Sequence, residues 1–171
     1  MSSFDTAVTI VLAHEGGFVD NPNDDGGATN YGISSAWLKS QGFPCDHDAV
    51  KSITEDDAKN FYFNFWWSPQ RYGEITDQDV ATKCLDGSVN MGCYQANKLL
   101  QRSLCDLGRQ IDVDGKIGPH TLLAVNLCDP KLLITKMISA YCAFYRGLVA
   151  SQPRYSTFLS GWLHRANWPI T

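Results

Sequence analysis

The sequence predicts a mostly α fold (α+β) with two lobes and a small β element after the first helix. Apolar residues recur at helical spacing over most of the chain, and one segment rich in Gly, Asn, Asp and Pro interrupts this pattern at 18–29. The 171 residues are 44% hydrophobic and 12% aromatic. A chain of this length and composition can bury one sizeable core but is too short for two ordinary domains, so we expect one compact domain.

The first helix is expected over residues 3–14. Its apolar side chains recur three and four residues apart, at Phe4, Ala7, Val8, Val11 and Leu12. Ser2 and Asp5 fit a capping box at its start, and Gly16 and Gly17 end it. The following segment FVDNPNDDGGAT is typical of a loop, with short strands expected at 18–19 and 30–33.

Later helices are expected from the same spacing and from capping residues. Thr54 caps a helix whose first turn is acidic and whose apolar face is Ala58, Phe61, Tyr62 and Phe65. Further helices are predicted at 34–38, 78–90, 93–106, 119–127, 130–149 and 156–165. Asp114 and Gly115 form a turn, after which Pro119 starts one of these helices.

Composition excludes several classes of protein. There are 14 basic and 18 acidic residues, a formal net charge of -4, which argues against nucleic acid as a partner. The start MSSFDTAVTIVLAHE has no basic region or small-residue cleavage site, so we do not expect a signal peptide. No later stretch approaches the ~18 apolar residues of a membrane span, so none is expected.

The cysteines form no C-x-x-C pair, and several occupy apolar helical positions. They are Cys45, Cys84, Cys93, Cys105, Cys128 and Cys142. Free thiols are favoured because Cys behaves as a small hydrophobic residue. A disulfide formed after release from the cell is the alternative.

Glu15 is a polar residue at a position where the helical spacing of the first apolar series predicts an apolar one. Burial beside the core and the negative end of the helix dipole both disfavour a charge there, so replacement by Gln is expected not to lower the melting temperature. A neutral carboxylic acid is what a glycosidic leaving oxygen requires. The alternative is a structural carboxylate that bonds loop amides or pairs with an Arg.

The loop after Glu15 supplies further polar groups. Asp20, Asp24 and Asp25 follow within ten residues and could orient a water molecule, although each Asp is also a common turn residue. His14 and Glu15 begin like the zinc motif H-E-x-x-H, but position 18 is Phe, which removes the second ligand. We therefore expect no metal and no organic cofactor.

The run HEGGFVDNPNDDGGATNYGIS, from His14 to Ser34, resembles the signature of glycoside hydrolase family 108, whose members are bacterial and phage muramidases. The resemblance implies a lysozyme-like fold with Glu15 as the catalytic residue. The spacing Glu15, Asp24, Thr29 is also similar to the Glu, Asp, Thr pattern of phage-type lysozymes, with one residue fewer before the Thr. It implies catalytic roles for Asp24 and Thr29.

The second half resembles the peptidoglycan-binding region that follows the family's catalytic segment. The segments that carry this resemblance are VATKCLDGSVNMG, ANKLLQRSL, DVDGKIGPHT and GWLHRAN. It implies a catalytic segment at 1–75 and a peptidoglycan-binding region at 76–171. No linker divides them and neither offers much core alone, so we expect both in one lysozyme-like domain with the glycan between its lobes.

Candidates for binding sugar rings are Tyr31, Tyr62, Trp66 and Asn90, since aromatic faces stack on pyranoses and amides bond N-acetyl groups. Aromatic residues at helical spacing usually belong to the core, which is the alternative for Tyr62. Trp66 and Trp67 are adjacent and point two ways, so one of them can reach the glycan.

The sequence thus favours an endolysin-type N-acetylmuramidase that hydrolyses the β-1,4 bond between N-acetylmuramic acid and N-acetylglucosamine. The alternatives are a lytic transglycosylase on the same bond and a non-catalytic wall-binding protein. We expect a monomer whose partner is the glycan strand of peptidoglycan. It would be made in the host cytoplasm and would act on the wall in the periplasm after release.

Overall fold

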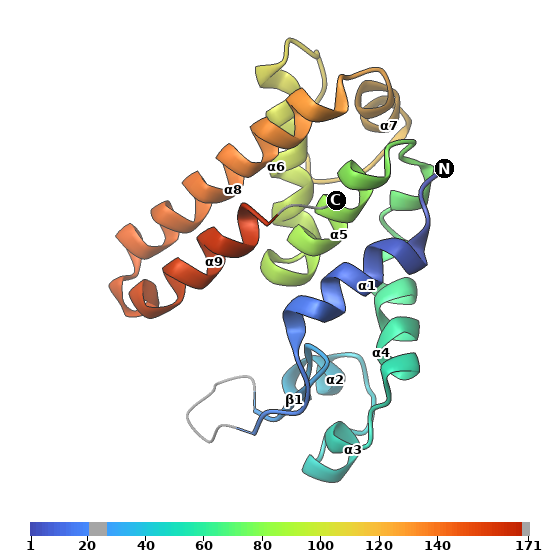
Figure 1. The fold of residues 1–171 in the computed structure, drawn as a ribbon, viewed down its shortest axis with the longest axis vertical. Coiled ribbons are helices and arrows are strands. Elements are labelled where there is room, and N and C mark those ends of the chain that lie inside the picture. The colour runs from blue at the N-terminus through green and yellow to red at the C-terminus, as the bar shows by residue number, and fades with distance from the viewer. Residues whose placement is uncertain (21–26, 169–171) are drawn as a thin grey trace.

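The computed structural model describes residues 1–20 and 27–168. In Figure 1, α1 runs between two groups of elements, one holding α5 to α9 and the other holding the hairpin, α2 and α3. The elements are α1 (Phe4–Glu15), β1 (Thr29–Asn30), β2 (Ile33–Ser34), α2 (Ser35–Ser40), α3 (His47–Lys51), α4 (Glu55–Phe61), the π-helix η1 (Tyr62–Trp67), the 3₁₀ helix η2 (Tyr72–Glu74), α5 (Gln78–Met91), α6 (Cys93–Asp106), α7 (Pro119–Asn126), α8 (Pro130–Ser151), the 3₁₀ helix η3 (Pro153–Phe158) and α9 (Leu159–Ala166). The mostly α fold with a small β element is therefore confirmed.

Helix α1 follows its sequence pattern closely. Ala7, Val8 and Val11 are buried, and the helix ends where Gly16 takes a φ of 70°. The N-cap is Ser3, whose hydroxyl accepts from the amide of Thr6, so the expected capping box at Ser2 is wrong. The hydroxyl of Ser2 donates to the carbonyl of Ile75 instead, which fixes the start of the chain against the segment before α5.

A two-residue turn closes the hairpin of β1 and β2. The strands pair Thr29 with Ser34 and Asn30 with Ile33, and both turn residues, Tyr31 and Gly32, have positive φ. Of the expected strand at 18–19, only Val19 pairs, in a single bridge with Thr29.

Buried Asn30 anchors the hairpin to the α3 region. Its side-chain amide donates to the carbonyls of Val50, Lys51 and Ile53 at 3.1–3.3 Å. The hairpin next to the end of α1 is therefore held in place by the segment that follows it.

The predicted helix after Thr54 changes type partway along. Thr54 and Asp57 form the capping box of α4, and the chain then continues as a π-helix from Tyr62 to Trp67. The wider turn buries Tyr62 and Trp67, while Trp66 stays partly exposed and packs on Trp37. The side chains of the adjacent Trp66 and Trp67 therefore point in different directions, as the sequence predicted. π-Helical turns are rare and often occur near functional sites.

Helix α5 is the centre of the fold, since every residue from Val80 to Ser88 is buried. It packs against α1, α6 and α8. One continuous core therefore joins both halves of the chain, with Val8, Leu85, Leu100 and Met137 among its members. The halves are two lobes of one packed body.

Helix α8 is long and apolar enough to cross a membrane by length and composition alone, with a mean hydropathy of 1.2 over its most apolar window. The expectation that no stretch approaches this length is therefore wrong. In the fold, α8 packs against α5, α6 and α9, and Leu133, Met137 and Tyr141 lie in the core.

All six thiols are free in the structure, as the sequence favoured. Cys84 and Cys142 are buried, and the other four are partly buried. Burial raises the pKa of the Cys84 thiol, so it stays protonated and unreactive.

Candidate active site

Glu15 is the last residue of α1 and lies where the two groups of elements meet. Its side chain is only 16% exposed, and its Oε1 lies 2.6 Å from Nη1 of Arg165 on α9. Its other oxygen faces the hairpin turn, because a Cβ added to Gly32 would lie 2.7 Å from Oε2. Three elements, α1, α9 and the hairpin, together fix this carboxylate.

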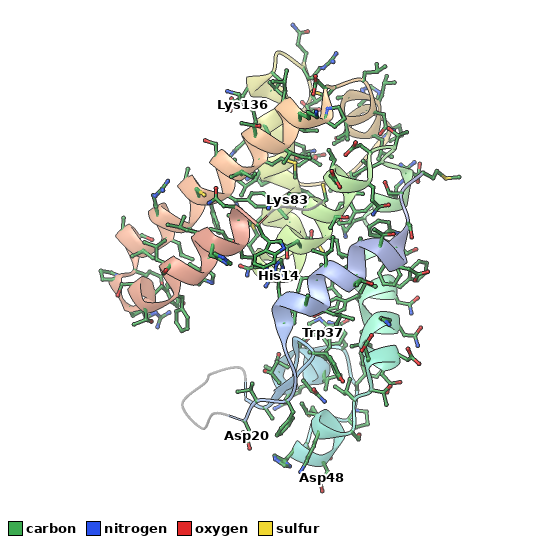
Figure 2. The ribbon with its side chains drawn as sticks, viewed as in Figure 1. His14, Asp20, Trp37, Asp48, Lys83 and Lys136 are labelled. Atoms are coloured by element: carbon green, nitrogen blue, oxygen red, sulfur yellow. The ribbon has the colours of Figure 1, made fainter. Side chains whose placement is uncertain are left out.

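Arg165 links Glu15 to a second buried carboxylate, Asp86 of α5. Its Nε donates to Oδ1 of Asp86 at 2.8 Å, and Nδ1 of His14 lies 3.2 Å from the same oxygen. Because a carboxylate can only accept, Nδ1 of His14 carries the proton in this contact. In Figure 2, His14 reaches from the end of α1 toward α5, where Lys83 also lies. We call Glu15, Arg165, Asp86 and His14 the buried charge chain.

The charges in the buried charge chain compensate one another. Burial raises the pKa of Asp86, but the hydrogen bond from His14 and the charge of Arg165 outweigh it and hold that pKa below its usual value. Burial lowers the pKa of Arg165, but Asp86 and Glu15 outweigh it and raise that pKa. The expectation of an uncompensated buried charge at Glu15 is therefore wrong. Glu15 is paired with an Arg through Oε1, while Oε2 faces the hairpin turn.

The hairpin turn is packed tightly beneath Glu15. The hydroxyl of Tyr62 donates to the carbonyl of Tyr31 at 2.9 Å. Burial, followed by the charge of Glu15, raises the pKa of Tyr62, so this hydroxyl keeps its proton. Gly32 has a φ of 77° and no space for a side chain against Tyr62 and Glu15. The π-helix that buries Tyr62 therefore positions the turn and, through it, the carboxylate.

The structure contradicts one sugar-binding prediction and leaves the others in partly exposed positions. Tyr62 has no exposed surface, so its predicted contact with sugar rings is wrong, and the alternative of a core residue is confirmed. Tyr31 and Trp66 are partly exposed. Asn90 is partly exposed at the end of α5, where its Oδ1 accepts from the hydroxyl of Tyr145 on α8.

The other predicted catalytic residues lie on the hairpin or outside the described residues. Thr29 is in β1, the strand that leads into the turn beneath Glu15, and its hydroxyl donates weakly to the carbonyl of Gly27 at 3.4 Å. Asp24 lies outside the described residues, as does Asp25.

Asp20 lies in the other lobe, away from the buried charge chain. It is half exposed, and its Oδ2 is 3.4 Å from Nε2 of His47. Figure 2 shows Asp20 beside the hairpin and His14 near α5. The structure therefore does not place Asp20 with Glu15.

Metal ligands do not converge around Glu15 in the part of the chain that is described. Residues 1–20 and 27–168 contain no group of three or more His, Cys, Asp or Glu side chains able to hold a metal ion. Phe18, which occupies the position of the missing zinc ligand, packs edge-on against His47. Among the described residues, the cation that pairs with Glu15 is the guanidinium of Arg165, which also bonds the carboxylate of Asp86.

Sequence reasoning missed Arg165 and Asp86. Asp86 breaks a buried run of α5 in the way that Glu15 breaks the stripe of α1, so the same pattern could have identified it. Arg165 lies in the GWLHRAN segment, which was noted only as a resemblance. Nothing local to α9 indicates that this Arg reaches a carboxylate near the other end of the chain.

Two family models and a solved structure match this chain. Residues 8–92 match the family model described as Glycosyl hydrolase 108, and residues 95–167 match the model described as Predicted Peptidoglycan domain. The first match ends at Gly92, between α5 and α6, and the second begins in the first turn of α6. No curated protein matches the sequence significantly. A solved structure described as "Structure of Brucella abortus SagA" is 32% identical, covers 95% of this chain and 88% of its own, and has a TM-score of 0.80.

Proposed function

Because this chain belongs to the glycosyl hydrolase 108 family, we propose that it is an N-acetylmuramidase. Family membership and the peptidoglycan domain make it a glycoside hydrolase that acts on peptidoglycan. The proposed bond is the β-1,4 linkage between N-acetylmuramic acid and N-acetylglucosamine. The observation that carries this proposal is Glu15, a carboxylate held in one orientation by Arg165 and by the hairpin turn.

In the proposed reaction, Glu15 is the general acid. Arg165 holds Oε1, so Oε2 is the oxygen that would donate the proton to the leaving sugar oxygen. Arg165 and Asp86 are positioning residues, because they act on the substrate only through Glu15. Their burial excludes water and keeps the carboxylate in a single geometry before substrate arrives.

The attacking group in this proposal is water held by the loop after Glu15. Asp24 remains the sequence-based choice to orient it, and Thr29 lies on the strand at the end of that loop. Replacement of Asp24 by Ala is expected to reduce hydrolysis while sacculus binding is retained. Replacement of Asp20 is expected to leave hydrolysis unchanged, because that side chain pairs with His47 on the other lobe.

Mass spectrometry of the fragments released from purified sacculi tests the proposal. A muramidase gives reducing N-acetylmuramic ends, whereas a lytic transglycosylase gives anhydro ends that are one water lighter. Anhydro ends would reject the hydrolase and favour the transglycosylase. Binding to sacculi without any released fragment would favour a non-catalytic wall-binding protein.

An endolysin role of phage type is the proposed setting for this activity. The protein would be made in the host cytoplasm and act as a monomer on the wall from the periplasm after release. Expression in a bacterial cell with and without a pore-forming partner tests this setting. Lysis that depends on the partner would support it, and lysis by the protein alone would contradict the need for assisted release.

A further inference from the structure

A hollow of about 610 Å³ lies in front of the N-terminus of α7. Its polar lining includes Gln101, Asp112, Asp114, Lys116, His120 and Thr121. In Figure 1, α7 lies at the end of the α5 to α9 group that is remote from the C-terminal end of α1, so this hollow is separate from Glu15. Its volume suits a ligand the size of a short peptide.

Two buried amide side chains hold the loop that forms the wall of this hollow. Gln101 is 1% exposed, and its Oε1 accepts from the amide of Gly115 at 2.7 Å. Its Nε2 donates to Oδ1 of Asp114 at 2.8 Å and to the carbonyl of Lys116 at 3.0 Å. Asn97, also 1% exposed, donates to the carbonyl of Gly115 at 3.0 Å. The wall is therefore preformed, and a ligand need not order it.

The lining carries charges of both signs. Asp112 and Asp114 supply two carboxylates, and hydrogen bonds from Gln101 and from the amide of Lys116 hold the pKa of Asp114 below its usual value. The side chains of Lys116 and His120 are exposed on the same lining. Helix α7 also begins there without a side-chain cap, so the free amides of His120 and Thr121 and the helix dipole favour a negative group.

We propose that this hollow binds a zwitterionic group at the end of a peptide side chain, in which one carbon carries both an ammonium and a carboxylate. The two aspartates would accept from the ammonium, and Lys116 with the start of α7 would hold the carboxylate. N-acetylglucosamine carries no charge and N-acetylmuramic acid carries no ammonium, so neither sugar would use both charges of this lining. The proposed function supplies the source of the ligand: in peptidoglycan, a diamino acid of the stem peptide carries this group.

Calorimetric titration of the full chain with a free stem peptide tests the proposal. The probe is the tripeptide L-alanyl-γ-D-glutamyl-meso-diaminopimelate, and the matched peptide ends in L-lysine, which keeps the ammonium but lacks the second carboxylate. The first peptide is expected to bind roughly tenfold or more tightly than the second. Lys116→Ala and Asp112→Asn are each expected to weaken its binding by roughly tenfold.

Matched surface variants serve as controls for this experiment. Lys136→Ala on α8 and Asp106→Asn at the end of α6 remove the same exposed charges elsewhere, and binding is expected to be unchanged. Absence of binding to the wild type, or equal binding by Lys116→Ala and Lys136→Ala, would overturn the site. Equal binding of the two peptides would overturn recognition of a zwitterion.

The same titration separates this proposal from the muramidase proposal. Glu15→Gln leaves the hollow intact, so it is expected to bind the tripeptide with wild-type affinity while it clears sacculi far more slowly than the wild type. A wild-type chain that binds the tripeptide but releases no glycan fragments would refute the muramidase proposal alone. A chain that cleaves sacculi but does not bind the tripeptide would refute the peptide site alone.

Discussion

Replacement of Glu15 by Gln separates the catalytic role of this residue from its structural role. The substitution keeps the shape of the side chain, but it removes the proton that a general acid donates and the charge that pairs with Arg165. We expect the rate of sacculus clearing to fall by about 10²–10⁴-fold, the usual contribution of general acid catalysis. Clearing is measured as loss of turbidity.

The structure also predicts a loss of stability for this variant. Nη1 of Arg165 lies 2.6 Å from Oε1 of Glu15, and the two side chains are 14% and 16% exposed. Removing the charge of one partner in a largely buried ion pair costs more than the ~0–1 kcal/mol of an exposed pair, so the loss is about 1–2 kcal/mol. It stays below the ~3–5 kcal/mol of an orphaned buried charge because Arg165 keeps Asp86. The melting temperature should fall by roughly 2–8 °C.

An exposed pair of the same type is the control. Glu74 pairs with Arg71 at 2.7 Å, but its side chain is 48% exposed. Glu74→Gln is therefore expected to leave both melting and clearing unchanged, because solvent screens this pair. A Glu15→Gln protein that melts at or above the wild-type temperature would refute the argument from the buried pair. One that clears sacculi at nearly the wild-type rate would refute Glu15 as the acid.

Three further predictions follow from the buried charge chain and the turn. Arg165→Lys keeps the charge but cannot bond Glu15 and Asp86 together, so both the melting temperature and kcat should fall; an unchanged kcat would contradict the positioning role. The fold lowers the pKa of Asp86, so its ionised form stabilises the protein above the unfolded pKa of about 3.9, and this stabilisation is lost as pH falls through the lower folded pKa. In melts taken from pH 6 to 2, Asp86→Asn should therefore show a smaller fall in melting temperature with pH than the wild type. Gly32→Ala should lower the yield of folded protein or its melting temperature far more than Gly42→Ala. Both glycines have a positive φ, but a Cβ at Gly42 would meet no other atom, so equal effects would show that crowding at Glu15 is absent.

Most of the secondary structure could be predicted from the sequence because it depends on local patterns. The first apolar series located α1 and placed Glu15 at its end, and Thr54 and Pro119 marked the starts of α4 and α7. Helical spacing and caps act between residues three or four positions apart, so they can be read without the fold. The π-helix at Tyr62 could not be read this way, because its side chains follow helical spacing in either form.

The environment of Glu15 was decided by the tertiary structure. The sequence determined that a carboxylate ends the apolar stripe of α1, and it favoured an unpaired buried acid, with a pair to an Arg as the alternative. Packing of α9 against α8 and of α1 against α5 brings Arg165 and Asp86 to that carboxylate and reverses the expectation. Ion pairs between distant segments have no period in the sequence, because they depend on where whole helices pack. For the same reason, only the fold joins Gln101 to the loop before α7 and forms the hollow there.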